Sequence, residues 1–343
     1  MKRGAIMKVT VRIPFLNDAI KERLTKTADE IGYSINFLSM DDVTLADFGD
    51  SNILFGRFPA EMIKDVKDLK WLQLPSAGIN GFTDDSIYPN NDVILTNASG
   101  AFGVTIAEYQ VMMLLMMMRM APQYLEGQKI ARWKNLGAVR SIFGSRILVV
   151  GTGNLGGEFA KRVKAFGAHV VGIRKNGNKL VEGFDEMHNI ADLDEQLGLA
   201  DVIALNLPGT DDTTGLMTAQ RIAMLKEDAI LMNVGRGTAI DQDALNEALR
   251  GGKIAGALLD VTNPEPLPAD HPLWTAPNCL VTPHVSDNYS LQYTCEVLLD
   301  IFENNLKKFA KGEKLAAKIT LQQRFAARKC DTAARIIIKR LVF

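Results

Sequence analysis

Three polar residues each stand a few positions beyond an apolar, strand-like run in the second half of the chain: Arg236, Glu265 and His284. In a doubly wound parallel sheet, ligands bind outside the carboxyl ends of the strands, so three successive loops of this kind place the side chains around one crevice. A guanidinium polarises a carbonyl and binds a carboxylate, and a histidine donates a proton near neutral pH. A carboxylate beside the histidine stabilises its charged form. This set of residue types predicts carbonyl reduction, with Arg236, Glu265 and His284 as the catalytic residues.

Each of these residues also has a structural alternative. Arg236 is suited to an ion pair within its own loop, and Glu265, between two prolines, is suited to a solvated position in a rigid turn. The remaining histidines are interpreted as a strand start, a polar loop and a turn before proline, respectively: His169, His188 and His271.

A glycine-rich segment, Gly151-Thr152-Gly153-Asn154-Leu155-Gly156, follows one expected strand and opens an expected helix. Gly151 permits the tight turn, Gly153 lets the backbone approach a pyrophosphate, and Gly156 lets helix and strand pack closely. The helix N-terminus then presents N–H groups and the positive end of its dipole to the phosphates. The pattern predicts a dinucleotide site.

The residue expected to choose between NAD and NADP stands at the end of the next strand. NAD sites usually carry an acid there, which binds the ribose 2′-hydroxyl. This chain has Arg174 at that place, followed by Lys175. The pair predicts NADP as the preferred cofactor, with NAD as the other candidate, and an exposed basic turn is the structural alternative.

Strand-like and helix-like runs alternate over the first hundred residues, and the pattern restarts at 146. This alternation predicts an α/β fold with parallel sheets covered by helices. A methionine-rich helix is expected from roughly Thr105 to Gln123 and is interpreted as buried nearly all round. Its alternative is a helix at a subunit interface.

Composition excludes several classes of protein. The chain has 343 residues, 39 basic and 40 acidic side chains and a net charge of −1, which argues against a nucleic-acid binder driven by phosphate contacts. No segment approaches the ~20 apolar residues needed to cross a bilayer, and no secretory signal is recognised. Three cysteines without metal-ligand spacing favour a reduced, cytoplasmic setting and predict no metal site.

Together the motifs resemble the D-isomer-specific 2-hydroxyacid dehydrogenase family over roughly residues 7–318. Besides the glycine-rich segment, the resemblance rests on the segments at 76–80, 96–97, 107–109, 233–237, 256–261, 265–268 and 282–284. Thr262-Asn263 departs from the family, which usually has an aromatic–acid pair there.

The resemblance implies two doubly wound parallel-sheet domains, with a Rossmann dinucleotide-binding domain (100–285) inserted into a flavodoxin-like substrate domain (7–99 and 286–318). It implies that His284 protonates the 2-oxo oxygen, that Glu265 raises the histidine pKa and that Arg236 holds the substrate. It further implies substrate binding by Ala77 and Gly78, and cofactor contacts from Asn154, Leu155, Leu207, Pro208, Thr213, Val234 and Asp260.

The expected activity is reduction of a small 2-oxo acid, with hydroxypyruvate and glyoxylate as candidate substrates, by a homodimer. A short-form phosphoglycerate dehydrogenase and a non-catalytic dinucleotide-sensing protein of the same fold are the alternatives. The basic tail, 319–343, is assigned no domain, and its removal is expected to leave folding and activity intact.

Overall fold

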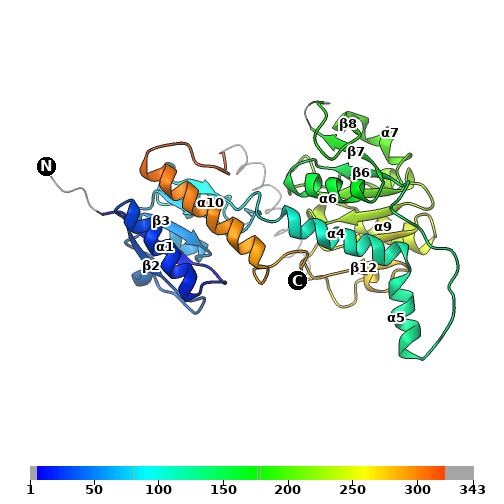
Figure 1. Cartoon of the computed structure of the whole chain (residues 1–343), viewed down its shortest axis with the longest axis horizontal. Helices are drawn as coiled ribbons and strands as arrows, with labels where there is room; N and C mark the ends of the chain where they lie inside the picture. The colour runs from blue at the N-terminus through cyan, green and yellow to red at the C-terminus, as the bar shows by residue number, and fades with distance from the viewer. Residues whose placement is uncertain (1–5, 80, 176, 178, 321–343) are drawn as a thin grey trace. The chain divides into compact units, whose positions relative to one another are not determined.

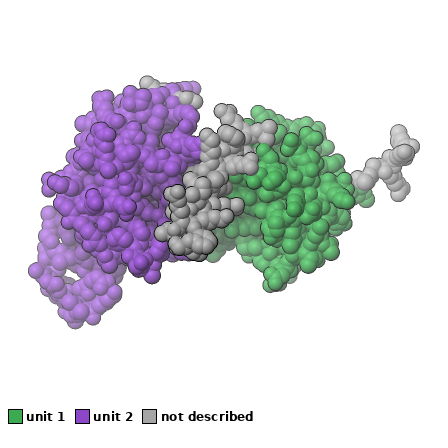
Figure 2. Space-filling view, turned by 180° about the vertical axis from the view of Figure 1, so that it is seen from behind, with its two compact units in different colours: residues 1–102, 288–336 green, residues 103–287, 337–343 purple. Residues whose placement is uncertain are grey.

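The computed structural model describes residues 6–79, 81–175, 177 and 179–320, and its chain divides into two compact units. Of the described residues, those within 6–102 and 288–320 form unit 1 and those within 103–287 form unit 2 (Figure 2). The predicted boundaries were 99/100 and 285/286. The predicted tail lies outside the described residues from 321 onward.

Unit 1 contains a five-stranded parallel sheet in the order β2-β1-β3-β4-β5 (Figure 1). Its strands are β1 (Lys8–Arg12), β2 (Ser34–Phe37), β3 (Ile53–Gly56), β4 (Trp71–Gln73) and β5 (Ile94–Thr96). Its helices are α1 (Asp18–Glu30), α2 (Leu45–Phe48), α3 (Ala60–Ile63) and α10 (Gln292–Ala310).

The last helix of unit 1 packs against strands from the beginning of the chain. The Phe302 ring of α10 stacks on Phe55 of β3 and on Trp71 of β4, with ring centroids 4.1 and 5.5 Å apart. All three side chains are fully buried. Burial of large aromatic side chains contributes strongly to stability, so α10 is an integral part of the first sheet's core.

Unit 2 contains a seven-stranded parallel sheet in the order β12-β11-β10-β9-β6-β7-β8. Its strands are β6 (Arg146–Val150), β7 (His169–Arg174), β8 (Glu186–Asn189), β9 (Val202–Leu205), β10 (Ile230–Asn233), β11 (Gly256–Leu259) and β12 (Cys279–Val281). Its helices are α4 (Gly103–Met118), α5 (Ala121–Lys129), α6 (Asn154–Ala165), α7 (Leu193–Leu197), α8 (Ala219–Ala223) and α9 (Gln242–Arg250). Two parallel α/β sheets confirm the predicted fold class.

The methionine-rich segment differs from the prediction, because it forms two helices instead of one. Helix α4 ends at Met118, Met120 adopts a left-handed backbone with φ +53°, and α5 begins at Ala121. Pro122 explains the break, since proline lacks the N–H that would continue the helical ladder and clashes with the preceding turn. Burial is also one-sided: Met113 and Leu114 are buried, whereas Met112 is exposed.

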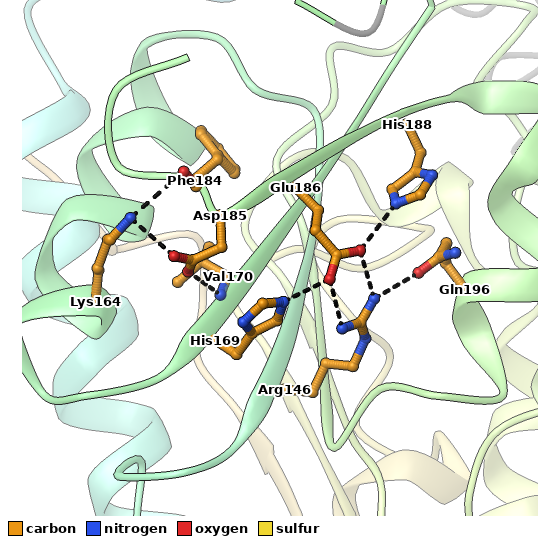
Figure 3. Close-up of polar contacts among 9 residues, drawn as sticks. All are labelled: Arg146, Lys164, His169, Val170, Phe184, Asp185, Glu186, His188 and Gln196. Atoms are coloured by element: carbon orange, nitrogen blue, oxygen red, sulfur yellow. Dashed lines mark hydrogen bonds and ion pairs between the residues drawn. The ribbon is translucent and has the colours of Figure 1, made fainter. Parts of the chain in front are cut away.

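A polar cluster joins the amino ends of three neighbouring strands of unit 2 (Figure 3). Glu186, which begins β8, pairs with Arg146 of β6 through two hydrogen bonds of 3.0 and 2.9 Å. Its carboxylate also contacts His169 Nε2 at 2.6 Å and His188 Nε2 at 3.1 Å. The prediction of a polar loop around His188 is therefore wrong, because the segment is a strand. Its sequence, Glu-Met-His-Asn, contains too few apolar residues to indicate a strand.

We expect Glu186→Gln to destabilise the protein at neutral pH. Arg146 first, then His188 and His169, hold the Glu186 pKa well below its ordinary value of 4.5. A lowered native pKa stabilises the fold above about pH 4.5 and ceases to do so as the pH falls through the native value. Because the carboxylate is 36% exposed, the expected loss is only about 1 kcal/mol.

Urea unfolding at pH 7.5 measures this effect. Glu182→Gln is the matched control, since that carboxylate is 86% exposed and lies 3.7 Å from its lysine partner. A Glu186→Gln protein as stable as the control at pH 7.5 would show that the cluster does not stabilise the sheet.

Two further structural findings concern the described residues only. Within these ranges, no single helix combines the length and apolarity needed to cross a membrane; α4 and α5 meet the criteria only as a pair, bent by 66°. Among the same residues, no group of three or more His, Cys, Asp or Glu side chains is placed to hold a metal ion.

Candidate active site

The topology of unit 2 brings the three predicted catalytic residues to one edge of its sheet. Arg236, Glu265 and His284 follow β10, β11 and β12, which are adjacent in the sheet and parallel. Their carboxyl ends therefore lie side by side. The strand order reverses between β6 and β9, because β7 and β8 follow on one side of β6 and β9 to β12 on the other. Sheets of this type bind ligands at that position.

His284 and Glu265 form a direct pair at this edge. His284 Nδ1 donates to Glu265 Oε2 at 2.9 Å, and Glu265 Oε1 accepts from the backbone N–H of Thr262 at 3.1 Å. With Nδ1 engaged in this way, Nε2 is the histidine nitrogen that remains for a substrate. Both side chains are partly exposed, at 49% and 39%.

The pair changes the acidity of both partners. The hydrogen bond to Glu265 raises the His284 pKa above its ordinary value of 6.5, outweighing the opposing effect of burial and of Arg236. Burial acts to raise the Glu265 pKa, but the hydrogen bond and the charge of His284 dominate and leave it below 4.5. An imidazolium stabilised by a carboxylate is a suitable proton donor near neutral pH.

Arg236 lies close enough to act electrostatically on both partners, lowering the pKa values of Glu265 and His284. Its Nη1 donates to the carbonyl of Gly235 at 2.7 Å. The backbone of this turn is fixed by Asn233, whose side chain donates to the Arg236 carbonyl and accepts from the Gly235 N–H at 2.9 and 3.0 Å. The structure thus brings the three predicted residues together.

Asp260 holds the turn that carries His284. Its buried carboxylate accepts hydrogen bonds from Thr282 Oγ1 at 2.7 Å, Val285 N at 2.9 Å and Ser286 N at 3.0 Å. The His284 N–H donates to the Asp260 carbonyl at 2.8 Å, and these contacts hold the His284 backbone at φ +53°. Such a conformation is uncommon for a non-glycine residue and needs surrounding support.

Tyr109 extends this network and was missed by sequence reasoning. Its hydroxyl bonds to Thr282 Oγ1. Because the Thr282 proton goes to the Asp260 carboxylate, the tyrosine must be the donor. Burial raises the Tyr109 pKa to about 12, so the hydroxyl keeps its proton. The predicted contact of Asp260 with a nicotinamide carboxamide remains a prediction.

The glycine-rich turn has the shape of a pyrophosphate cradle. Gly151 has φ +96°, and a Cβ there would lie 2.5 Å from the Asn206 carbonyl. A Cβ on Gly156 would lie 2.0 Å from the Gly151 carbonyl, which explains why helix α6 needs glycine at this contact. Gly153, the N-cap of α6, has open space around it and no side-chain cap. These features fit a dinucleotide cofactor, with the first N–H groups of α6 facing its phosphates.

Asn154 is predicted to meet the pyrophosphate, and its side chain also has a structural contact. A Cβ on Gly103, the first residue of α4, would lie 2.3 Å from Asn154 Oδ1. The side chain therefore packs over the start of α4. Asn154 and Leu155 are the first two residues of α6, so their backbone N–H groups belong to the helix terminus that the prediction uses.

The other predicted cofactor contacts surround the same turn. Leu207 approaches both Gly151 and Gly235, where added Cβ atoms would lie 3.1 Å from Leu207 Cδ2 and 2.4 Å from its carbonyl. Val234 is buried at the end of β10. The Thr213 hydroxyl donates to the Pro208 carbonyl at 2.7 Å and so closes the loop after β9. Their contacts with a cofactor stay predictions.

Arg174 is the last residue of β7, beside β6 and its glycine-rich turn. Its side chain is half-buried, and within the described ranges its guanidinium has no hydrogen-bond or ionic partner. The neighbouring Lys175 differs, because its ammonium pairs with Asp212 at 2.5 Å. Of the two cations, Arg174 is thus better placed to bind a ligand.

The predicted substrate-binding residues Ala77 and Gly78 belong to unit 1, in the turn after β4. Their carbonyls accept from Asn97 Nδ2 at 2.6 Å and from Ser76 Oγ at 2.8 Å, respectively. Within the described part of the chain, their N–H groups have no hydrogen-bond partner. Their binding of a substrate carboxylate remains a prediction.

Comparison with known proteins decides the family. The D-isomer specific 2-hydroxyacid dehydrogenase NAD binding domain matches residues 111–286 of this chain. The chain belongs to the D-isomer specific 2-hydroxyacid dehydrogenases. The predicted membership is therefore confirmed, and the chain is an NAD(P)-dependent oxidoreductase that interconverts 2-oxo and 2-hydroxy acids.

Relatives of this dehydrogenase cover most of its length. A family protein from Aeromonas salmonicida is 36% identical, with a TM-score of 0.80 over 92% of this chain and 99% of that one. Human glyoxylate reductase/hydroxypyruvate reductase is 30% identical over 74% of this chain and 78% of its own. D-3-phosphoglycerate dehydrogenase from Methanocaldococcus jannaschii is 30% identical over 90% of this chain but only 58% of its own length.

Proposed function

We propose that this dehydrogenase reduces a small 2-oxo acid of the glyoxylate or hydroxypyruvate type to the D-2-hydroxy acid, with NADPH as the preferred hydride donor. The observation that carries the proposal is the His284–Glu265 pair beside Arg236, on the sheet edge that also bears the glycine-rich turn. The similarity to a glyoxylate/hydroxypyruvate reductase along most of both chains supports the choice of substrate class.

The residues of unit 2 divide the reaction between them. Arg236 binds the substrate's carboxylate and carbonyl oxygens and stabilises negative charge on the latter. A nicotinamide cofactor held at the glycine-rich turn would supply the hydride to C2. His284 Nε2 gives its proton to the carbonyl oxygen as charge develops there, and the neutral imidazole that remains is still held by Glu265. In the oxidative direction the same nitrogen accepts the proton from the hydroxyl.

A substrate panel tests the proposal. We expect NADPH oxidation with glyoxylate and hydroxypyruvate at higher kcat/KM than with 3-phosphohydroxypyruvate. A preference for the phosphorylated substrate would instead support a short-form phosphoglycerate dehydrogenase. Cofactor binding without turnover of any 2-oxo acid would support the non-catalytic alternative and overturn the proposal.

We further propose that the protein is a homodimer through unit 2. Helix α5 and the extended segment after it project from the rest of this unit (Figure 1). They carry exposed large apolar side chains: Leu125, Ile130, Trp133 and Val139. A cavity of about 340 Å³ lies beside them, lined by residues that include Met116, Pro122 and Cys279. A group of exposed large apolar side chains on one segment is typical of a protein–protein contact.

Light scattering after gel filtration measures the oligomeric state. We expect two subunits for the wild type and dissociation of the Trp133→Ser variant, because Trp133 is fully exposed in the single chain. Leu180→Ser, at an exposed leucine outside this segment, is the control and should remain dimeric. A wild-type monomer at micromolar concentration would contradict the proposal.

We propose a cytoplasmic location, which the cysteines support. Within the described residues, Cys279 is a free thiol. Free thiols of this kind are typical of reducing compartments. Cell fractionation tests the location, and recovery with secreted proteins would contradict it.

A further inference from the structure

The loop that carries Glu265 is fixed by contacts that sequence reasoning did not find. Its first residue, Thr262, packs so closely on Gly237 that a Cβ there would lie 2.0 Å from the Thr262 carbonyl carbon. Thr262 Oγ1 also donates to the Pro264 carbonyl at 3.0 Å. These contacts hold Thr262 and Pro264, whereas Asn263, near the centre of the loop, is held by another element.

Gln242 clamps that centre from the first turn of α9. Gln242 Nε2 donates to the Asn263 carbonyl at 2.6 Å, and the Asn263 N–H donates to Gln242 Oε1 at 2.9 Å. One side-chain amide therefore satisfies both backbone polar groups of the residue two positions before Glu265. A two-bond contact fixes orientation as well as distance, which one hydrogen bond does not.

The backbone of Gln242 is held in place by helix α9. Gln242 opens α9, whose N-cap Asp241 accepts a hydrogen bond from the Ala244 N–H at 3.0 Å. The same helix buries Leu245 and Leu249 in the core of unit 2. A half-buried side chain at the start of an anchored helix can hold a loop in place, because neither its backbone nor its stem is free to move.

We propose that Gln242 is a positioning residue of this dehydrogenase, which holds the 262–266 loop so that Glu265 Oε2 stays within hydrogen-bond distance of His284 Nδ1. The inference rests on the proposed function, since it concerns the same proton donor. Gln242 itself need touch neither substrate nor cofactor, and it acts through Glu265.

The charges around His284 make this role measurable. The groups that act on His284 are Glu265 from the loop after β11, Arg236 from the turn after β10 and Asp260 at the end of β11. Glu265 and Asp260 favour the protonated imidazole, whereas Arg236 opposes it. If Glu265 moves away, its stabilisation of the imidazolium is lost while the opposing charge of Arg236 remains. The His284 pKa should then fall even if the fold is intact.

The experiment compares four full-length proteins: wild type, Gln242→Met, Glu265→Gln and Asp243→Asn. Methionine keeps the approximate volume of glutamine and removes both hydrogen bonds. Asp243 is the control, since it stands in the same helical turn, is exposed, and within the described ranges has no hydrogen-bond or ionic partner. NMR titration of the histidine ring protons gives the His284 pKa without reference to activity, and His284→Gln assigns its signal among the 4 histidines.

We expect the His284 pKa to fall in Glu265→Gln, to fall less but in the same direction in Gln242→Met, and to stay at the wild-type value in Asp243→Asn. The kcat for reduction in Gln242→Met should drop roughly two- to tenfold at pH 8, with KM less affected. Gln242→Glu, which keeps the acceptor for the Asn263 N–H, serves as a second variant if the methionine protein does not fold.

The two possible failures are distinguishable. A folded Gln242→Met protein with the wild-type His284 pKa, alongside a shifted Glu265→Gln protein, overturns the positioning role alone. A wild-type protein that turns over no 2-oxo acid overturns the proposed function, while the titration still reports whether Gln242 fixes the pair.

Discussion

Replacing His284 with alanine should lower kcat for 2-oxo acid reduction roughly 10²–10⁴-fold, the range of a lost general acid. The effect is expected to be large because His284, held by Glu265 at 2.9 Å, is the proposed proton donor. NADPH binding should persist, since the cradle is built from the glycine-rich turn and α6. Stopped-flow or steady-state kinetics together with NADPH fluorescence titration separate the two effects.

The same role of His284 predicts how the rate of reduction depends on pH. Reduction requires the imidazolium, so kcat/KM should fall as the pH rises through the His284 pKa, which Glu265 holds above 6.5. Glu265→Gln removes the carboxylate charge and should move this alkaline limb to lower pH. Near-normal turnover in His284→Ala, or a limb unmoved in Glu265→Gln, would remove the proton-donor assignment.

The second large effect concerns the choice of cofactor, for which we expect the wild type to prefer NADPH to NADH. A guanidinium binds a 2′-phosphate through charge-assisted hydrogen bonds, which contribute ~1.5–3 kcal/mol, or roughly 10- to 100-fold in kcat/KM. Arg174 ends β7 at the expected place. Because its side chain is partly exposed, screening should bring the preference toward the lower figure.

Arg174→Asp should invert or abolish the preference, because a carboxylate repels the phosphate and accepts from the ribose hydroxyls. Lys175→Gln is the matched control: its ammonium is already paired with Asp212 at 2.5 Å, so its loss should cost less. Added salt should weaken the wild-type preference. If the wild type had equal or higher kcat/KM with NADH, Arg174 would not select the cofactor.

The sequence by itself determined the fold class and the strand ends that carry chemistry. Alternation of apolar strands with helices is a local pattern, and it predicted the restart of the α/β pattern at 146, where β6 begins. Parallel strands share one carboxyl edge, so Arg236 and His284 could be assigned to one edge without knowledge of any contact. The glycine spacing specified a backbone turn in the same local way.

Segments whose conformation depends on distant partners could not be predicted in this way. The strand β8 is polar in sequence, and its Glu186 is held by Arg146 and His169 from two other strands. Pro122 indicates the interruption between helices α4 and α5, but the methionine-rich sequence around it favoured one continuous helix.

Only the tertiary structure decided how the proposed proton donor, His284, is held. The bonds from Tyr109 through Thr282 to Asp260, and from Gln242 to Asn263, join residues 173, 22 and 21 positions apart. No periodicity or spacing encodes such pairs, since a hydrogen bond depends on distance and angle in space. The sequence supplies the groups, and the packing of α4 and α9 on the sheet sets which of them meet.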